Sequence, residues 1–539
     1  MPDIVAGVLV WSVVTPQAVA YAQIAGLPPS AGLAAAPGAL LAYALLGTSR
    51  SLVVSATTAT SALSAAAVGP LANGDTMTFA ALSAALALVA AAVLVGAGLL
   101  RLGGVMDLVS KPVMTGFLFG LGLTVAVGQL PKIFGVEGGS GHFFELVRDL
   151  VKVLGDTHAW TLAVGVGSIA ALIAFGKLAP RVPGTLVVLA VSIAASALLD
   201  LAGHGVDVVG DLPSAVPDPS IPDVSWRDLA ELLPAAFGVM IVSAEAIGVA
   251  RSLASSQGYS VQVSRDLVAL GGSNLLAGLS GGFVQSGGAS QTMAAERAGG
   301  KTQLVSVIAA GLILLTGAFL AFLFQDLPQA TLGAIVVVAI AGFFRVDELR
   351  RFAHLRRSAI VLSLVALVGV LVFGVLPGLL IAVGLSLVVL IQRLSRPSAA
   401  TLARDPVTGA WGSAERHPDW SLVAGVMVAR SDGPLFYANT VNLRDRLLAA
   451  VHQAEPRPHA VVLDLAESPD LDVETLDTLA ELADMLAAEG FELRLAAVRA
   501  PALELLRRSG LAARVRIDPT LDAAVRPSPD REHSPHPMR

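Results

Sequence analysis

The stretch Gly47–Pro70 reads GTSRSLVVSATTATSALSAAAVGP and combines two properties that rarely occur together. From Ser55 to Gly69 it predicts a helix of fifteen residues, about 22 Å long at about 1.5 Å per residue. A helix that crosses a bilayer core of about 30 Å needs about 20 residues. The first turns of this short helix also carry five hydroxyl groups, those of Ser55, Thr57, Thr58, Thr60 and Ser61. The stretch is therefore both too short and too polar for an ordinary membrane span.

The composition of the chain nevertheless indicates an integral membrane protein. Of the 539 residues, 55% are hydrophobic and 14% are charged, and the mean hydropathy is +0.73. Soluble domains carry about 25% charged residues. Twenty of the 35 Lys and Arg residues lie in residues 1–396, so the charge is concentrated in the last part of the chain. The absence of cysteine excludes disulfides and Cys-based metal sites, and the net charge of −6 argues against a nucleic-acid partner.

Fourteen apolar segments are predicted. The start MPDIVAGVLVWSVVTPQAVAYA lacks the basic leader and cleavage site of a signal peptide and predicts a first span interrupted at Pro16. The segments begin near Ile4, Ala31, Ser55, Met77, Asp107, Trp160, Val182, Leu229, Leu267, Ala289, Gln303, Ala330, Ile360 and Leu376. With the amino terminus in the cytoplasm, the inside loops hold fourteen Lys and Arg residues and the outside loops hold four. This asymmetry is expected of a correct topology, and an even number of spans places the carboxyl terminus in the cytoplasm of a cell (inner or plasma) membrane.

Seven plus seven spans predict an inverted repeat, because an odd number of spans per half makes the second half enter upside down. The third span of the second half then falls in residues 281–304, GGFVQSGGASQTMAAERAGGKTQL, which is also short and rich in glycine and hydroxyls. Two such segments at corresponding positions indicate a substrate site near the membrane midplane. A second interpretation is that their small residues only allow helices to pack closely.

The paired half-helices suggest an anion site without a formal cation. If their amino termini face each other, each contributes free N–H groups and roughly +0.5 charge, and Ser and Thr cap such ends. The preceding residues, LVV at 52–54 and GFVQ at 282–285, are expected to form short extended segments that pair with each other.

Four motifs resemble the SulP anion-transporter family, which includes sulfate permeases and the motor protein prestin. They are TPQAVAYAQIAGLPPSAGLAA (15–35), YALLGTSR (43–50), AERAGGKTQL (295–304) and LPQATLGAIVVVAI (327–340). The resemblance covers nearly the whole chain. It implies seven-plus-seven inverted repeats arranged as a gate or core domain and a scaffold domain, a carboxyl-terminal STAS domain, and a homodimer.

The resemblance also implies which residues bind the anion. They would be Gln17 and Tyr21 from the first helix, Thr57 and Thr58 from the third, and Ala289, Ser290 and Gln291 from the tenth. Many members carry an arginine where this chain has Gln291, and a variant of VGPVA where this chain reads VSATTA. The site is therefore expected to hold its anion with neutral donors. This favours a monovalent anion, or an anion that enters with a cation or proton.

Glu245 is a carboxylate inside an apolar run, with no other charged residue between Glu231 and Arg251. Such a group costs about 2.5–3.5 kcal/mol on insertion scales and is by default a functional hypothesis. Burial favours the protonated form of a carboxyl group, and the resemblance places Glu245 on the eighth helix beside the substrate, so we expect it to couple transport to a proton or cation. The alternative is a structural hydrogen bond to Ser243 or to unwound backbone.

The soluble part alternates strand-like runs with helical periods, which predicts an α/β domain. The expected boundaries are a transmembrane domain at 1–396, a linker at 397–418, a STAS domain at 419–522 and a disordered tail at 523–539. Near the start of the helix at VETLDTLAELADMLAAEG, Asp472 is expected to be the N-cap. Thr475 is a second-choice interpretation as a regulatory phosphosite. The run Arg345–Arg357 is expected to be a basic cytoplasmic connector that sets topology and contacts anionic headgroups.

The sequence therefore predicts a secondary active transporter of a small inorganic or carboxylate anion of the sulfate, bicarbonate or dicarboxylate class. Coupling to H+ or Na+ through Glu245 and elevator-type alternating access are expected. The alternatives are an uncoupled anion channel, exchanger or voltage-responsive protein, and a nucleobase permease. No nucleophile–base pair, P-loop or metal-ligand pattern is present, so no enzymatic activity, metal or cofactor is predicted.

Overall fold

The computed structural model describes residues 2–72, 74–104, 109–139, 141–179, 183–210, 215–395 and 399–527. The chain divides into two compact units, Met1–Leu387 and Val388–Arg539, and each has its own apolar core. Within the described ranges, every one of the fourteen predicted segments corresponds to a helix. Eight helices there are long and apolar enough to cross a membrane.

The helices of the first half begin close to the predicted positions. They are α1 (Pro2–Ile24), α2 (Pro29–Leu46), α3 (Thr58–Ala72), α4 (Thr76–Leu99), α5 (Lys111–Phe134), α7 (Ala159–Leu178) and α8 (Gly184–Leu199). The predicted starts near Asp107 and Val182 lie outside the described residues, and α5 and α8 follow at Lys111 and Gly184. An additional amphipathic helix, α6 (Phe143–Val153), lies between α5 and α7.

The second half repeats this order. Its helices are α9 (Trp226–Ser256), α10 (Val263–Leu279), α11 (Ala289–Arg297), α12 (Leu304–Phe319), α13 (Gln329–Ile340), α15 (Arg357–Phe373) and α16 (Val375–Ser395). A short amphipathic helix, α14 (Val346–Leu355), precedes α15.

The helix contacts come in symmetry-related pairs, as an inverted repeat requires. Helix α2 packs on α12, and its counterpart α10 packs on α4, the counterpart of α12. The contact of α1 with α12 matches the contact of their counterparts α9 and α4. The contact of α5 with α15 matches that of their counterparts α13 and α7. The chain therefore has the predicted seven-plus-seven fold.

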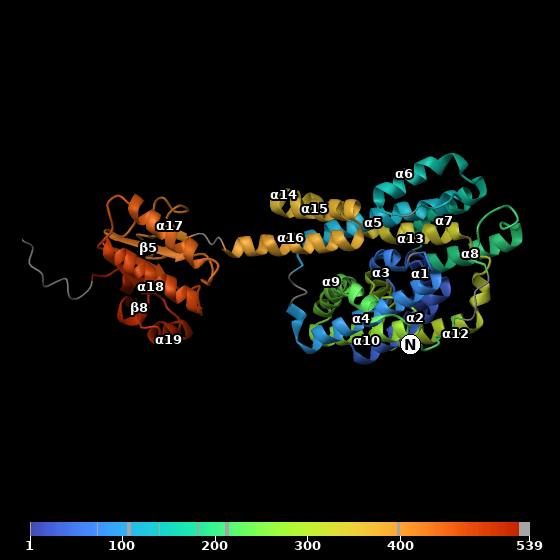
Figure 1. Ribbon diagram of the computed structural model, residues 1–539, viewed down its shortest axis with the longest axis horizontal. Helices are drawn as coiled ribbons and strands as arrows, with labels where there is room; N and C mark the ends of the chain where they lie inside the picture. The colour runs from blue at the N-terminus through green and yellow to red at the C-terminus, as the bar shows by residue number, and fades with distance from the viewer. Residues whose placement is uncertain are drawn as a thin grey trace, which may run out of the picture. The chain divides into compact units, whose positions relative to one another are not determined.

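The membrane unit has two groups of helices (Figure 1). We call α1–α4 and α9–α12 the core domain. The expected scaffold domain, which we name the gate domain from this point on, consists of α5, α7, α8, α13, α15 and α16. Close backbone contact holds the gate together, because a Cβ at Gly116 of α5 would lie 1.9 Å from the Ser363 carbonyl oxygen of α15. In lipid there is no hydrophobic driving force between helices, so they associate through the close van der Waals packing that small residues allow.

The second unit is an α/β domain built on a six-stranded sheet of order β4-β3-β5-β6-β7-β8. Strands β5 to β8 are parallel, whereas β3 is antiparallel to both of its neighbours. The strands are β3 (Ala399–Arg404), β4 (Trp411–Ser413), β5 (Val426–Ser431), β6 (Ala460–Asp464), β7 (Glu492–Ala496) and β8 (Arg516–Asp518). The helices are α17 (Thr440–Gln453), α18 (Val473–Ala488), α19 (Ala500–Arg508) and α20 (Leu521–Ala524).

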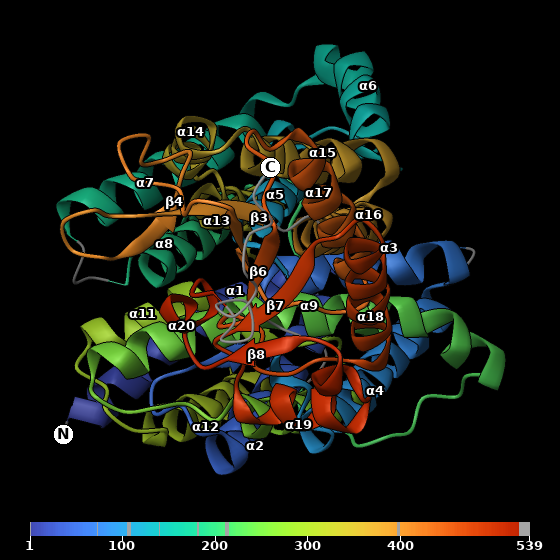
Figure 2. The ribbon, with the colours of Figure 1, turned by 90° about the vertical axis from the view of Figure 1, so that its left-hand side faces the viewer.

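Alternate residues along the parallel strands face different helices. Val461 and Leu463 of β6 belong to the apolar cluster formed with α17, α18 and α19, whereas Ala460 and Val462 belong to the cluster that contains α20. Figure 2 shows α17 and α18 beside the strands of this sheet. This is the pattern of a parallel sheet covered on both faces.

Two predicted boundaries of this domain differ from the structure. The predicted linker at 397–418 contains β3 and β4, which extend the sheet beyond β5. The edge strand β4 has three residues, too few to show a strand period, and β3 (AATLAR) shows no clear alternation of apolar and polar residues. The predicted tail at 523–539 begins inside α20, and the described residues continue to 527. The prediction of disorder for 528–539 lies outside the described residues.

Candidate functional site

A cavity of about 160 Å³ lies between the core and gate domains, at the amino-terminal ends of α3 and α11. Six of the seven predicted substrate-binding residues line it, namely Tyr21, Thr57, Thr58, Ala289, Ser290 and Gln291, and Glu245 lines it as well. The seventh residue, Gln17, lies behind the cavity wall, where its Oε1 accepts a hydrogen bond from Gln291 Nε2 at 2.8 Å. The structure thus brings the predicted residues together from four helices.

The two half-helices are positioned by a short antiparallel pair of strands, β1 (Val54–Ser55) and β2 (Ser286–Gly287). Val54 pairs with Gly287 and Ser55 pairs with Ser286. The predicted pairing is therefore confirmed, but its residues are shifted: β1 begins two residues after the start of the predicted 52–54, and β2 begins four residues after the start of the predicted 282–285. Because the strands run in opposite directions, they bring the starts of α3 and α11 to the same cavity.

Side chains from the family-like motifs fix the loop that leads into β1. Asp266 Oδ1 of α10 accepts hydrogen bonds from the Thr48 backbone N–H at 2.6 Å and from the Thr48 hydroxyl at 2.9 Å. Gln303 Nε2 donates to the carbonyl oxygens of Ser49 and Leu52. The motifs GTSR and KTQL, more than 250 residues apart, are thus parts of one hydrogen-bonded support.

The start of α3 satisfies most of its own polar groups. Thr57 Oγ1 accepts from the Thr60 N–H and Thr60 Oγ1 accepts from the Thr57 N–H, both at 3.2 Å. The hydroxyls of Thr60 and Ser61 donate to the Thr57 carbonyl oxygen. Two of the five hydroxyl residues in this region line the cavity, namely Thr57 and Thr58. Ser55, Thr60 and Ser61 do not. Thr57 therefore caps α3 through its bond from the Thr60 N–H as well as lining the cavity, and the Ser61 hydroxyl bonds back to the Thr57 carbonyl oxygen.

The start of α11 is different. Its N-cap is Gly288, which has no side chain to cap the helix. A Cβ at Gly288 would lie 1.8 Å from Gln291 Oε1, so glycine is required for Gln291 to adopt its position. Gln291 Nε2 also donates to the Ala56 carbonyl oxygen at 3.2 Å. Gln291 therefore links α11 both to α1 and to the entry of α3.

A positive charge at the cavity comes from a residue that the sequence analysis assigned to the basic connector. Arg345 lines the cavity, and its Nη2 lies 3.8 Å from Glu245 Oε1. Arg345 follows α13 in the gate domain, whereas Glu245 belongs to α9 in the core domain. The expectation of a site without a formal cation is therefore wrong, because folding replaces the missing arginine at position 291 by one from the opposite domain.

The contact between Glu245 and Arg345 is loose. The Arg345 side chain is 45% exposed and that of Glu245 is 25% exposed. Exposed ion pairs contribute about 0–1 kcal/mol, so a bound anion can compete for Arg345 at small cost. Ser243 does not hold Glu245, because its hydroxyl donates to the Val239 carbonyl oxygen of its own helix at 2.8 Å. Among the described residues there is no group of three or more His, Cys, Asp or Glu that could hold a metal.

Comparison with known proteins identifies the family. Residues 1–366 match the Sulfate permease family and residues 418–524 match the STAS domain. The chain belongs to the sulfate permease family. It is 35% identical over 510 residues to a probable sulfate transporter of Mycobacterium tuberculosis, covering 94% of this chain and 91% of that protein. It is 27% identical to sulfate transporter 3.2 of Arabidopsis thaliana, covering 94% and 82% of the two chains.

Solved structures with the same fold include the murine anion transporter Slc26a9 in the inward-facing state. The TM-score is 0.88 at 23% identity, over 97% of this chain and 90% of that chain. The transmembrane domain of the cyanobacterial bicarbonate transporter BicA matches with a TM-score of 0.63 at 22% identity, over 71% of this chain and 97% of that domain. The chain is thus a multi-pass anion transporter of the sulfate permease family with a carboxyl-terminal STAS domain.

One signal in the sequence of this transporter would have located Arg345. Helix α13 (Gln329–Ile340) has twelve residues, about 18 Å at about 1.5 Å per residue. A bilayer core is about 30 Å thick, and the helical path continues through a 3-10 turn (Ala341–Phe343) and α14, so Gln329–Leu355 counts as a candidate span. The break in this path lies at Arg345, beside the cavity. The basic run from Arg345 to Arg357 concealed this break because it resembles an ordinary topology signal.

In the STAS domain, the predicted N-cap is confirmed. Asp472 Oδ1 accepts from the Thr475 backbone N–H at 2.8 Å, and Asp472 Oδ2 accepts from the Tyr437 N–H at 2.8 Å. Partial burial raises the pKa of Asp472, but these hydrogen bonds outweigh it and hold the pKa below its ordinary value. The Thr475 hydroxyl is buried and contacts Thr440 Oγ1 at 3.0 Å. Phosphorylation of Thr475 stays a prediction, and it would require the start of α18 to open.

Proposed function

We propose that this transporter carries a small inorganic or carboxylate anion, of the sulfate, bicarbonate or dicarboxylate class, together with a proton bound by Glu245. The observation that carries the proposal is the ion pair between Glu245 and Arg345. Among the described residues that line the cavity, these two are the ones with charged side chains. They lie on opposite sides of the boundary between core and gate.

The proposed coupling follows from competition for Arg345. When Glu245 is ionised, its carboxylate neutralises the guanidinium at 3.8 Å and repels an incoming anion. When Glu245 is protonated, the guanidinium is available to the anion. The anion then completes its coordination with the N–H groups at the start of α11, where the helix dipole contributes roughly +0.5 charge. Proton and anion therefore favour each other's binding.

We further propose that the core domain moves against the gate in an elevator-type cycle. Glu245 and both half-helices move with the core, whereas Arg345 stays with the gate. A second contact between the domains joins Lys132 Nζ of α5 to Gln23 Oε1 of α1 at 2.8 Å. Both contacts would have to break for the core to change position. Neither is strong enough on its own to prevent this.

Uptake of labelled anions into proteoliposomes, with and without an inward proton gradient, tests this function. The panel contains sulfate, bicarbonate, chloride and fumarate. We expect gradient-driven accumulation of one of them. Glu245→Gln, which keeps the shape of the side chain and removes its titration, is expected to retain exchange of that anion and to lose accumulation.

The same experiment separates the alternatives. Accumulation driven by a sodium gradient instead of a proton gradient would show that the coupling ion is Na+. Flux that ignores both gradients and survives Glu245→Gln would indicate an exchanger or channel. Uptake of uracil in place of every anion would favour a nucleobase permease. The matched control is Glu231→Gln on the same helix, which lies outside the cavity and should leave accumulation unchanged.

From the loop charges and the even number of spans we infer that both termini face the cytoplasm, and from the family resemblance that the transporter is a homodimer. The chain contains no cysteine, so single cysteines report accessibility without background. A cysteine at Val407 of the STAS domain, which is 89% exposed, should react only after permeabilisation. A cysteine at Gly155 should react in intact cells. Crosslinking in native membranes tests the dimer.

A further inference from the structure

A second cavity, of about 620 Å³, opens where the end of α4 meets the start of α10. Three arginines line it: Arg101, Arg251 and Arg265. Gln262 and Ser264 add polar groups, and none of the described lining residues is acidic. The loop charges predict a cytoplasmic position for all three: Arg101 follows α4, Arg251 lies near the end of α9 and Arg265 lies in the first turn of α10. This concentration of guanidinium groups in a hollow serves no step of the proposed transport cycle.

The backbone at Arg101 is unusual. Arg101 has φ +57°, the left-handed conformation that residues with a side chain rarely adopt. The segment around it is pressed against α10, because a Cβ at Gly98 would lie 2.5 Å from the Ser264 carbonyl oxygen. Glycine would occupy position 101 without strain. An arginine held in this conformation at the wall of a cavity is therefore a candidate for function.

The start of α10 adds to the positive potential. Its N-cap, Gln262, makes no side-chain cap, and the helix dipole contributes roughly +0.5 charge at this end. Asp266 belongs to the first turn but does not line the cavity, and its Oδ1 is bound by Thr48. Arg265 Nε donates to the Leu46 carbonyl oxygen at 3.1 Å, which fixes the position of its guanidinium.

We propose that this cavity binds the phosphate headgroup of an anionic phospholipid. Leu99 lines the cavity and is 72% exposed, and the adjacent Leu100 is 73% exposed. Exposed leucines at a helix end beside clustered arginines match the two halves of a phospholipid, because acyl chains cover the leucines and the phosphate meets the arginines. A free phosphate ion would use the arginines and leave the leucines uncovered. The lipid therefore fits the whole surface.

The test measures lipid binding to the full-length protein in detergent by native mass spectrometry and by thermal unfolding. Phosphatidylglycerol and phosphatidylcholine are compared, with inorganic phosphate as the soluble probe. We expect phosphatidylglycerol to bind and to raise the melting temperature, with little effect of the other two. Replacing Arg101, Arg251 and Arg265 together by Gln should lower phosphatidylglycerol binding at least tenfold. The control replaces Lys177, Arg297 and Lys301 by Gln, which removes the same charge elsewhere on the same side.

A separate variant distinguishes loss of lipid binding from loss of folding. Arg101→Gly removes one guanidinium and also relieves the left-handed conformation, so it should melt at the same or a higher temperature without lipid. It should nevertheless bind phosphatidylglycerol several-fold more weakly. Equal losses in the control and the cavity variant would overturn the proposal, because the effect would then reflect net charge alone. An equal shift by inorganic phosphate would overturn the assignment to a lipid. These readouts do not depend on transport, so the proposed function can fail independently.

Discussion

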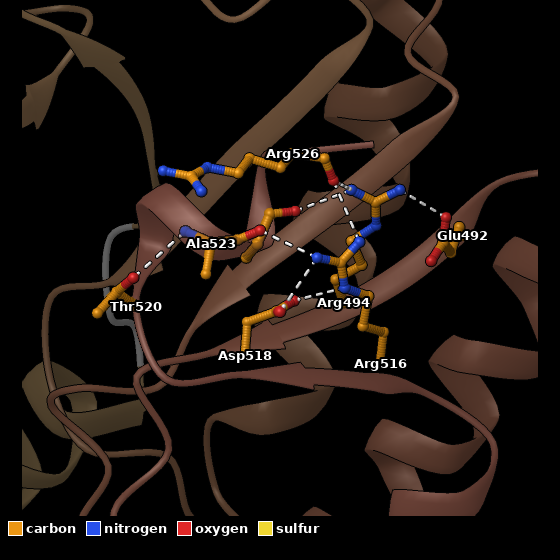
Figure 3. A network of polar contacts seen from close by, with 8 residues as sticks. Glu492, Arg494, Arg516, Asp518, Thr520, Ala523 and Arg526 are labelled. Carbon is orange, nitrogen blue, oxygen red and sulfur yellow. Dashed lines mark hydrogen bonds and ion pairs between the residues drawn. The ribbon is translucent and has the colours of Figure 1, made fainter. Parts of the chain in front are cut away.

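Two arginines in this protein, Arg494 in the STAS domain and Arg345 at the transport cavity, are held in opposite ways. The Arg494 side chain is 1% exposed and belongs to β7, the strand next to the edge strand β8. Its Nη1 donates to the carbonyl oxygens of Ala524 and Arg526 at 2.8 and 2.9 Å, and its Nη2 meets Glu492 Oε2 at 2.7 Å (Figure 3). Arg345 is 45% exposed and has a contact of 3.8 Å to Glu245.

The difference separates a structural charge from one that is available to a ligand. Burying a guanidinium is costly unless fixed acceptors surround it, and Arg494 has them in the chain end that it fastens to the sheet. Figure 3 shows Arg516 beside it, in contact with Asp518 and the Ala523 carbonyl oxygen. Arg345 keeps most of its hydrogen-bonding capacity and faces a cavity. We therefore expect loss of Arg494 to affect stability and loss of Arg345 to affect transport.

The largest effect is expected from Arg494→Ala. It removes the donor to the Ala524 carbonyl oxygen and the contact to Glu492, whereas the Arg526 carbonyl oxygen keeps Arg516 Nη1 at 3.1 Å. Each lost hydrogen bond of a charged group costs about 1.5–3 kcal/mol. Urea unfolding of the STAS domain, followed by hydrogen exchange of the β6 and β7 amides in the full chain, measures this cost. Arg416→Ala, at an exposed position, is the control and should change stability by less than about 0.5 kcal/mol. A similar small change for Arg494→Ala would remove the distinction between the two arginines.

Next in size is Arg345→Gln. Loss of the guanidinium should lower uptake at subsaturating anion at least tenfold, which corresponds to about 1.4 kcal/mol, while the melting temperature stays close to that of the unchanged protein. The reason is that its ion pair with Glu245 contributes about 0–1 kcal/mol. Arg350→Gln on α14, outside the cavity, is the matched control. A large loss of stability with normal uptake by the remaining folded protein would contradict this interpretation.

Gln291→Ala sharpens the comparison with a neutral group that lines the same cavity. Gln291 Nε2 already has two acceptors, Gln17 Oε1 and the Ala56 carbonyl oxygen. Its loss should therefore destabilise the core by about 1–3 kcal/mol and raise the apparent KM for the anion less than Arg345→Gln does. Thermal unfolding and concentration-dependent uptake of the same preparation measure both quantities. If KM rose more than for Arg345→Gln, Gln291 would be a primary ligand of the anion.

The smallest effect concerns pH and the N-cap of α18. Because hydrogen bonds hold the pKa of Asp472 below its ordinary value, its stabilisation is complete above the unfolded value of about 3.9. It is lost as the pH falls through the lower folded value. Asp472→Ala should cost about 1 kcal/mol at neutral pH, and the difference should shrink below pH 4. Hydrogen exchange at the start of α18 between pH 3 and 7 measures it. A difference that grew on acidification would have the wrong sign.

Much of this protein could be predicted from short sequence windows. Apolar run length predicted all fourteen spans, and the inverted repeat predicted that residues before Thr58 and Ala289 pair and that α3 and α11 meet at a cavity. The family resemblance implied that α1 and α9 complete this cavity. The family resemblance supplied the identities of Tyr21 and Gln291 at that cavity. These features depend on local periodicity and on the inverted repeat, and both can be read along the chain.

The parts that could not be predicted depend on contacts between distant residues. Arg345 and Glu245 meet across 100 positions of sequence because the end of α13 in the gate packs beside α9 in the core. Strand β3 joins the STAS domain by pairing with β4 and β5, and α20 packs on β7 and β8. With three residues in β4 and four in α20, these elements are too short to show a period.

The sequence by itself determined a membrane transporter with two half-helices and a STAS domain, because span length, charge asymmetry and periodicity are local properties of the chain. Only the tertiary structure decided the charge of its site. In the sequence, the lone carboxylate of Glu245 and the basic run Arg345–Arg357 are far apart, and folding brings Nη2 of Arg345 to 3.8 Å from the carboxylate. Electrostatic interactions depend on distance in space, and distance in space is set by how the core and gate domains pack.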